Sequence, residues 1–303
     1  MKTNSFSAWV LAVRPYSLGG AVIPVAVGTA LAYTAGSFRP VPALLCLLFA
    51  LLMQCTANLV NDLWDFLKGA DQPDRLGPDR AFAKGYITLP AMKRGIAFFT
   101  IASAIVGCGL LLWAIRYGEL RYGGWELVAA GAACILFAFL YTAGPWSLAY
   151  HGLGDVAVVL FFGLVPVLFT YYLQTGTWSG EAVVAALACG LVIDTMLMVN
   201  NFRDREEDAR CGKRTIVVCL GANVGRWGYL ALGTAAVALC LSLLAAGYLW
   251  AALLPLLYWF VFFATWRKMV RIDHGDELNV CLGETARNML LFGLLFTVGI
   301  LLG

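Results

Sequence analysis

The chain has 303 residues, of which 61% are hydrophobic and 13% charged, with a mean hydropathy of +0.79. Soluble domains have about 45–50% apolar and about 25% charged residues, so the composition excludes an ordinary soluble enzyme and indicates a polytopic membrane protein. The net charge of +3 is too small to suggest a nucleic-acid partner. The nine cysteines lie singly, without a CxxC pair, which disfavours a zinc site and a disulfide framework.

Apolar runs separated by polar breaks predict nine membrane-spanning helices, because a span needs roughly 20 apolar residues. The predicted spans are residues 18–36, 41–61, 95–115, 125–143, 154–174, 182–202, 227–247, 250–266 and 286–302. Nine spans use most of the chain and leave no room for a soluble catalytic domain. We therefore expect residues 1–303 to form a single all-α transmembrane domain, a bundle around a central cavity with short cap helices in the long connections.

Lys and Arg are distributed unevenly among the connections between the predicted spans. Eighteen of the 21 lie in the N-terminal segment or after spans two, six and eight. Only Arg39, Arg116 and Arg121 lie on the other side. Because positive charge marks the cytoplasmic side of a membrane protein, we expect a multi-pass protein of the cell (inner) membrane. Its N-terminus would be cytoplasmic and, after nine spans, its C-terminus would lie outside.

Ten of the 18 acidic residues gather in two groups that lie four spans apart. The first group follows span two and contains Asp62, Asp65, Asp71, Asp74 and Asp79. The second lies in or after span six and contains Asp194, Asp204, Glu206, Glu207 and Asp208. In the first group Asn58, Asn61 or Asp62, and Asp65 recur at helical spacing, as do Asn200, Asp204 and Asp208 in the second. Each group therefore places a stripe of amide and carboxylate oxygens on one helix face.

Carboxylates at positions i and i+4 repel each other unless a cation lies between them. Hard oxygen ligands of this kind suit Mg²⁺, which keeps several waters and is typically completed by substrate phosphates. Basic residues interleaved with the acids suit the phosphates themselves: Lys68, Arg75, Arg80, Lys84, Arg203, Lys213 and Arg214. The pattern predicts a diphosphate held by Mg²⁺ ions between the two stripes. A merely solvated charged loop is an equal alternative for four outer acids, Asp74, Asp79, Glu206 and Glu207.

Both acid-rich segments resemble motifs of a known family. NLVNDLWDFLKGADQPDRLGPDR (58–80) and NNFRDREEDARCGKRTIVVCLG (200–221) resemble the two aspartate-rich motifs of the UbiA superfamily of intramembrane aromatic prenyltransferases. The NDxxD core is matched by Asn61, Asp62 and Asp65, and the DxxxD core by Asp204 and Asp208. Neither core alone is specific, but their order, their separation by four spans and the nine-helix plan make the combination specific.

Longer stretches resemble one branch of this superfamily, the 1,4-dihydroxy-2-naphthoate polyprenyltransferases. Residues 68–88 are similar to the branch's KGxDxxDRxGPxR…KGxIT stretch, residues 141–155 to its loop after span four, and residues 14–32 to its first helix. The resemblance covers roughly residues 9–225. Two features depart from the pattern: Gly19–Gly20 stands where a Pro is common, and the DxxxD core is unusually charged.

The resemblance implies the reaction of menaquinone biosynthesis. A polyprenyl group would pass from an allylic polyprenyl diphosphate to 1,4-dihydroxy-2-naphthoate with loss of CO₂ and diphosphate, giving demethylmenaquinone. The implied Mg²⁺ ligands are Asn61, Asp65, Asp204 and Asp208, and Asp62 joins the three aspartates as a catalytic residue. The implied substrate-binding residues are Asn58, Lys68, Asp71, Arg75, Asn200, Asn201, Arg203 and Lys213, with Tyr141, Tyr150 and Asp155 as candidates for the acceptor.

Asp194 lies in the middle of span six, where an ionised side chain costs about 2.5–3.5 kcal/mol on insertion scales. It should therefore face the bundle interior. Because it precedes Asn201 by seven residues, it shares that residue's helix face. We hypothesise that Asp194 lines the reaction cavity and binds substrate below the metals; a protonated structural acid is the alternative.

Other classes of membrane protein fit less well. A CDP-alcohol phosphotransferase would carry a DGxxAR…GxxxDxxxD pattern, which the chain lacks. A transporter would have paired charges or broken helices near the midplane, whereas these acids gather at one interface. A UbiA-type prenyltransferase for another aromatic acceptor and a UbiA-type terpene cyclase share the metal motifs and remain alternatives.

Overall fold

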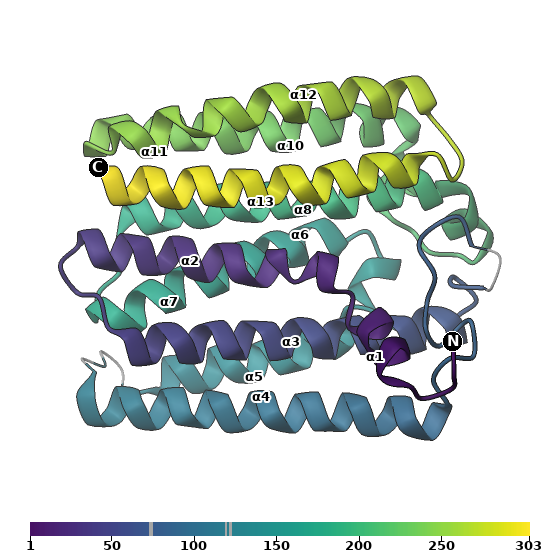
Figure 1. Cartoon of the computed structure of the whole chain (residues 1–303), viewed down its shortest axis with the longest axis horizontal. Helices are drawn as coiled ribbons and strands as arrows, with labels where there is room; N and C mark the ends of the chain where they lie inside the picture. Colours follow the sequence, from purple (N-terminus) through teal and green to yellow (C-terminus); the bar gives the residue numbers. More distant parts are fainter. Residues whose placement is uncertain (73–74, 119, 121–122) are drawn as a thin grey trace.

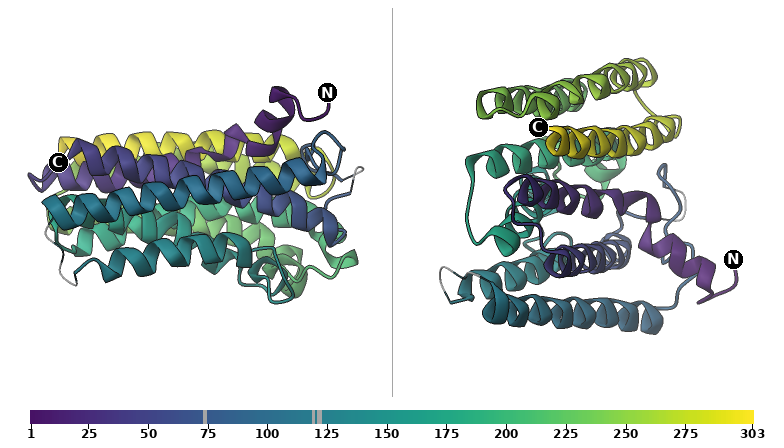
Figure 2. Two further views of the ribbon diagram at one scale, coloured as in Figure 1. Left: turned by 90° about the horizontal axis from the view of Figure 1, so that it is seen from below. Right: turned by 60° about the vertical axis from the view of Figure 1, so that its left-hand side comes forward.

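The computed structural model describes residues 1–303 except 73–74, 119 and 121–122, so Asp74 and Arg121 lie outside the described residues. In the described part, all regular structure is helical apart from one isolated bridge between His151 and Arg214. The long helices run side by side as one bundle (Figures 1 and 2). The predicted all-α class is confirmed.

The helices follow the predicted spans closely. The first half of the chain forms α1 (Phe6–Val13), η1 (Pro15–Ser17), α2 (Gly19–Thr34), α3 (Pro40–Leu67), α4 (Leu89–Tyr117), α5 (Trp125–Leu140) and η2 (Leu148–Tyr150). One rod then combines α6 (Gly154–Val158), the π-helical turn η3 (Val159–Leu164) and α7 (Val165–Thr175). The second half forms α8 (Gly180–Arg210), α9 (Ile216–Leu220), α10 (Ala222–Ser242), η4 (Leu243–Ala246), α11 (Leu249–Leu253), α12 (Pro255–Ile272) and α13 (Leu278–Leu302).

Among the described residues, seven helical segments are long and apolar enough to cross a membrane. The pair Phe6–Ser17 and Gly19–Thr34, which is bent by 48°, makes an eighth if it counts as one span. The fourth predicted span, 125–143, corresponds to α5, whose 16 residues fall short of the roughly 20 that a span uses. The number of full spans is thus slightly lower than predicted, and the helix order is the same.

Short cap helices were expected in both long connections. The second connection does contain one, α9 (Ile216–Leu220), whose first turn is capped by the Thr215 hydroxyl. The expectation is wrong for the first connection, because the described residues between Leu67 and Leu89 form turns. Gly69 and Gly85 have φ angles of +82° and +70° there, a conformation that stops a right-handed helix.

One close backbone contact in the bundle joins α8 to the rod 154–175. A Cβ built on Gly163 would lie 2.6 Å from both the Ala186 carbonyl oxygen and the Gly190 Cα atom, so the two backbones touch. Small residues allow such close helix contacts in membranes. In its most apolar stretch, α8 is 67% buried, against 17% for α4. The bundle therefore has a dense centre at α8 and a thin outer wall at α4.

One end of the bundle collects the segments that carry the charged motifs. The N-terminus, the connection 68–88, the connection after α8 and the connection between α12 and α13 all lie at the same end, and the C-terminus lies at the opposite end (Figure 1). Because α3 continues to Leu67 and α8 to Arg210, both beyond the predicted spans, both acid stripes lie on helix ends that project toward these connections.

Candidate active site

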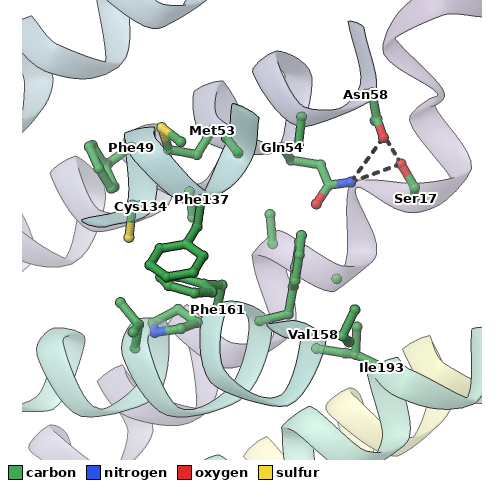
Figure 3. Close-up of a pocket in the computed structure, with 18 of the residues that line it drawn as sticks. Ser17, Phe49, Met53, Gln54, Asn58, Cys134, Phe137, Val158, Phe161 and Ile193 are labelled. Atoms are coloured by element: carbon green, nitrogen blue, oxygen red, sulfur yellow. Dashed lines mark hydrogen bonds between the residues drawn. The ribbon is translucent and has the colours of Figure 1, made fainter. Parts of the chain in front are cut away.

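A cavity of about 320 Å³ lies between the helices below this charged end. Its wall is largely apolar, and Figure 3 shows Phe49 and Met53 of α3, Cys134 and Phe137 of α5, and Phe161 of η3 along it. Asn61, Tyr141 and Asn200 line the part of the wall that lies nearest the charged motifs. The arrangement suits a ligand with a long apolar part and an anionic head.

Three polar side chains form a hydrogen-bonded group on the same wall (Figure 3). The Gln54 amide donates to Asn58 Oδ1 (3.2 Å) and to Ser17 Oγ (3.3 Å), while Asn58 Nδ2 lies 3.0 Å from Ser17 Oγ and 2.7 Å from the Val13 carbonyl oxygen. These bonds leave Gln54 Oε1 buried and without a hydrogen-bond partner. A buried oxygen of this kind is costly unless a donor reaches it, so Gln54 is suited to accept a hydrogen bond from a ligand.

Two guanidinium groups, those of Arg14 and Arg80, also line the cavity. Arg14 is 8% exposed and its Nη2 has no hydrogen-bond partner, whereas Arg80 Nε pairs with Asp71 at 2.9 Å. Burial would lower the pKa of Arg80, but Asp71 and neighbouring acids outweigh it and raise the pKa above its usual value. The fully buried Asp62 adds negative charge near both arginines. The cavity therefore offers fixed positive charge to an anionic group.

The first acid stripe is held by the loop that follows α5. Thr142 donates a hydrogen bond to Asn61 Oδ1 (2.9 Å), and the Tyr150 hydroxyl donates to Asp65 Oδ1 (3.0 Å). Burial together with the Asp65 carboxylate raises the pKa of Tyr150, so this phenol remains a hydrogen-bond donor. The loop thus orients two of the predicted metal ligands and leaves further oxygen lone pairs on both.

The second stripe meets the first connection through arginine. Arg203 donates to both Asp204 oxygens (2.6 and 2.7 Å), and Arg75 Nη2 lies 3.3 Å from Asp204 Oδ2. Arg75 Nε also forms an ion pair with Asp71 at 2.6 Å. Burial would raise the pKa of Asp71, but the guanidinium groups of Arg80 and Arg75 outweigh it and hold the pKa below its usual value. Segments about 130 residues apart are therefore joined by one charged network.

Lys213 connects the two stripes. Its Nζ lies 3.6 Å from Asp208 Oδ1, and the carboxylate of Asp65 acts on it even more strongly. Burial would lower the pKa of Lys213, but these two carboxylates outweigh it and raise the pKa. Asp208 Oδ2 is buried without a hydrogen-bond partner. Lys213 therefore pairs with Asp208 of the second stripe and is stabilised by the charge of Asp65 in the first, while joint metal binding by Asp65 and Asp208 stays a prediction.

The two stripes offer oxygen ligands that fit a hard divalent cation but form only part of a metal site. In the described part of the chain, no three His, Cys, Asp or Glu side chains converge closely enough to hold a metal ion by themselves. The unpartnered Asp208 oxygen, the Asp65 carboxylate and the Asn61 amide are nevertheless the oxygen ligands that Mg²⁺ prefers. An incomplete protein ligand set suits Mg²⁺ that arrives with a diphosphate, because phosphate oxygens and water fill the remaining positions.

Three other predicted residues occupy supporting positions. Lys68 Nζ donates to the Gly144 carbonyl (2.8 Å) and to Ser147 Oγ (2.6 Å), and it lies 4.0 Å from the centre of the Tyr150 ring. Asn200 donates to the Met196 carbonyl (2.8 Å), and Asn201 is 6% exposed. Lys68 therefore braces the loop that carries Tyr150.

The hypothesis that Asp194 lines the cavity is wrong. Ile193, Met196, Leu197 and Asn200 of the same helix contribute to the wall, but Asp194 does not. Its side chain is 1% exposed and its Oδ1 has no hydrogen-bond partner. The acid that acts on it is Asp155 of α6, whose Oδ1 is also buried and unpartnered. Two such carboxylates cannot both be ionised at low cost.

Replacing Asp194 by asparagine is expected to leave turnover unchanged and to raise the free energy of unfolding by about 1 kcal/mol, because an amide beside Asp155 removes the repulsion between two buried acids. The matched control is Asp62→Asn: this acid is fully buried beside Arg14 and Arg80, so losing its charge should cost about 3 kcal/mol. Thermal unfolding in detergent measures the stability of each variant, and a turnover assay measures its activity. Loss of turnover by Asp194→Asn at unchanged stability would restore a direct role in the reaction.

Two cavity residues were missed in the sequence. Arg14 is one of the N-terminal basic residues that indicate topology and begins the stretch 14–32 that resembles a first helix, but no site role was predicted for it, although it follows directly on the first apolar helix. Gln54 carried a readable signal, because it lies four residues before Asn58 and seven before Asn61, on the helix face of the first acid stripe. A polar side chain inside an apolar span at that spacing indicates the same cavity.

A largely apolar cavity inside a helical bundle, with Asn61 and Asn200 of the two stripes and the basic Arg14 and Arg80 on its wall, fits an intramembrane prenyltransferase. The chain belongs to the UbiA prenyltransferase family, whose model matches residues 21–280. It is 37% identical to the 1,4-dihydroxy-2-naphthoate octaprenyltransferase of Escherichia coli (strain K12) over 97% of this chain and 95% of that protein. It is 34% identical to the enzyme of the same name from Haemophilus influenzae, over 100% of this chain and 98% of that protein.

Solved structures share the fold at low sequence identity. The apo structure of a UbiA homolog from Aeropyrum pernix K1 has a TM-score of 0.67 and 16% identity, over 94% of this chain and 97% of that chain. A UbiA homolog from Archaeoglobus fulgidus bound to GPP and Mg²⁺ has a TM-score of 0.61 and 15% identity, over 98% of this chain and 100% of that chain. These likenesses confirm the predicted fold.

Proposed function

We propose that the protein transfers a polyprenyl group from an allylic polyprenyl diphosphate to 1,4-dihydroxy-2-naphthoate, releasing diphosphate and CO₂ and giving demethylmenaquinol, the reduced form of demethylmenaquinone. One observation carries the proposal most directly: Arg75 and Lys213 join the two acid stripes next to an apolar cavity. The names of the similar enzymes from Escherichia coli and Haemophilus influenzae support the choice of acceptor.

In this proposal Asn61, Asp65, Asp204 and Asp208 hold Mg²⁺, and Arg75, Arg203 and Lys213 bind the diphosphate. Bound Mg²⁺ would neutralise the charge that develops on the leaving diphosphate. The basic side chains add fixed positive charge at the same place and need little reorganisation, because the acids already hold them in position. Asp62 and Asp71 support the site by balancing Arg14 and Arg80.

The acceptor would lie in the cavity beside the polar group of Ser17, Gln54 and Asn58. Arg14, which has an unpartnered Nη2, is placed to receive a carboxylate, and Gln54 Oε1 is placed to accept a hydrogen bond from a ring hydroxyl. Of the three residues expected from the sequence to contact the acceptor, Tyr141, Tyr150 and Asp155, this proposal keeps Tyr141, which lines the cavity. Tyr150 is engaged with Asp65, and the Asp155 carboxylate acts on Asp194.

With both substrates in place, the ring carbon attacks the allylic carbon as the bond to diphosphate breaks. The new carbon–carbon bond forms where the carboxylate then leaves as CO₂, and the electron pair of the broken bond returns to the ring. The chain holds the two reacting carbons close together and keeps water away, because the surrounding wall is apolar.

We also propose that the charged end of the bundle faces the cytoplasm of the cell (inner) membrane. This end carries the N-terminus and the Lys- and Arg-rich connections, and the C-terminus lies at the opposite end. A water-soluble aromatic acid and the released diphosphate would then exchange with the cytoplasm, while the polyprenyl chain stays in the lipid bilayer.

The test is an assay of the purified protein in detergent with Mg²⁺, one polyprenyl diphosphate, and either 1,4-dihydroxy-2-naphthoate or 4-hydroxybenzoate. Mass spectrometry is expected to find a prenylated naphthalene that has lost its carboxylate, no product from 4-hydroxybenzoate, and no product after chelation of the metal. A prenylated ring that keeps its carboxylate would exclude the menaquinone reaction, and the protein would then be a prenyltransferase of the same family with another reaction. A cyclised isoprenoid formed without an acceptor would indicate a terpene cyclase.

A further inference from the structure

Asn279, the second residue of α13, reaches the charged site from the last helix of the chain. Its Oδ1 accepts a hydrogen bond from Arg203 Nη1 (3.0 Å), and its Nδ2 donates to the Leu76 carbonyl oxygen (2.8 Å). One amide therefore joins α13, which carries no acid motif, to both motif segments at once. Leu76 lies 203 residues before Asn279 in the chain, and Arg203 lies 76 residues before it.

The Arg203 guanidinium needs such a partner. It is 3% exposed, and its Nε and Nη2 both bind Asp204. A Cβ built on Gly77 would lie 2.6 Å from both Arg203 Nη2 and Arg75 Nη1, so two guanidinium groups approach each other across this glycine. Like charges at such a separation repel unless anions or carbonyl oxygens hold them. Asp204, Asn279 Oδ1 and the Pro78 carbonyl, which accepts from Arg75 Nη1 at 2.7 Å, supply those partners.

We propose that Asn279 is a positioning residue: it holds the Arg203 guanidinium and the turn of residues 75–78 in the relative position in which Arg203 and Arg75 bind the diphosphate. The inference rests on the proposed function, in which Asp204 turns its oxygens to a metal ion. Arg203 then loses two of its bonds, and Asn279 keeps the guanidinium beside Arg75. An amide side chain can accept from Arg203 and donate to the Leu76 carbonyl at the same time, whereas a carboxylate has no donor and an apolar side chain has neither group.

The first experiment compares Asn279→Ala with the wild type. The KM for farnesyl diphosphate and the Mg²⁺ concentration for half-maximal rate are each expected to rise about tenfold, the effect of one lost hydrogen bond to a charged group. The KM for the aromatic acceptor should stay within about twofold, because Asn279 does not line the cavity. Hydrogen exchange of the amides of residues 75–88 in the protein without metal or substrate should become faster.

Two further variants separate positioning from general stability. Asn279→Asp keeps the acceptor for Arg203 and loses the donor, so it should restore the KM for farnesyl diphosphate while exchange at 75–88 stays fast. Asn288→Ala is the matched control, because Asn288 lies on the same helix, is 1% exposed, and donates to Thr265 Oγ1 (2.9 Å) away from the site. It should lower the melting temperature without changing either KM.

An Asn279→Ala variant with wild-type KM values and wild-type exchange would overturn the proposal, as would the same KM shift in Asn288→Ala. A wild type that converts no acceptor would count against the proposed function alone. In that case binding of farnesyl diphosphate with Mg²⁺, together with the exchange at 75–88, still decides the role of Asn279.

Discussion

Asp65→Asn and Asp204→Asn are each expected to lower turnover at least about 10³-fold, because each removes a negative ligand from the proposed Mg²⁺–diphosphate site. Asparagine is preferred to alanine. In the structure Asp204 is the counter-ion of Arg203 and Arg75, and Asp65 accepts from Tyr150, so deleting either side chain would leave buried partners unsatisfied. Single-turnover prenyl transfer at saturating Mg²⁺ gives the measurement.

The matched control is Glu206→Gln, in the same motif. The Glu206 side chain is 66% exposed and pairs only at 3.7 Å with the exposed Arg210, so this variant should keep wild-type turnover. If Asp204→Asn kept substantial activity at wild-type stability, the two-stripe metal site would be refuted.

The second large effect is expected at the contact between α8 and the rod 154–175. Gly163→Ala should destabilise the protein by about 3 kcal/mol, because the added Cβ would meet the Ala186 carbonyl and the Gly190 Cα at 2.6 Å and backbone atoms cannot turn aside as a flexible side chain can. Thermal unfolding in detergent measures the change, and turnover should fall with the folded fraction.

Gly109→Ala is the control for this substitution. Gly109 lies in α4 with no atom within 4 Å of a built Cβ, so alanine should be neutral or stabilise the helix by about 0.5–1 kcal/mol. Equal stabilities of the Gly163→Ala and Gly109→Ala variants would show that α8 and the rod 154–175 are not in backbone contact.

The spans and the two stripes could be predicted because both depend on local patterns. A run of apolar residues fixes a span by its length, and oxygen ligands four residues apart fix a helix face. It is harder to predict which side of a buried helix faces the cavity when all the residues around the polar one are apolar. Asp194 was assigned to the cavity from its helical spacing to Asn201, but the neighbouring Ile193 and Leu197 face the cavity instead.

Contacts between distant segments could not be predicted from the sequence. The bonds from Arg75 to Asp204 and from Asn279 to Leu76 join residues 129 and 203 positions apart. They depend on how α3, α8 and α13 pack and on the turns at Gly69 and Gly85, and neither the charge pattern nor the hydropathy records that packing. Neither does the sequence show that Arg14 turns inward, which depends on the bend between α1 and α2.

The size of the cavity bears on the length of the isoprenoid in the product. About 320 Å³ is near the lower end of the 300–1,000 Å³ that drug-sized ligands occupy. It has room for an aromatic ring and the first isoprene units of a polyprenyl chain, and we expect the remaining units to extend beyond the cavity into lipid. An enzyme built in this way has no means of measuring the far end of its substrate. The tail length of the quinone would then be determined by whichever synthase supplies the polyprenyl diphosphate to the membrane.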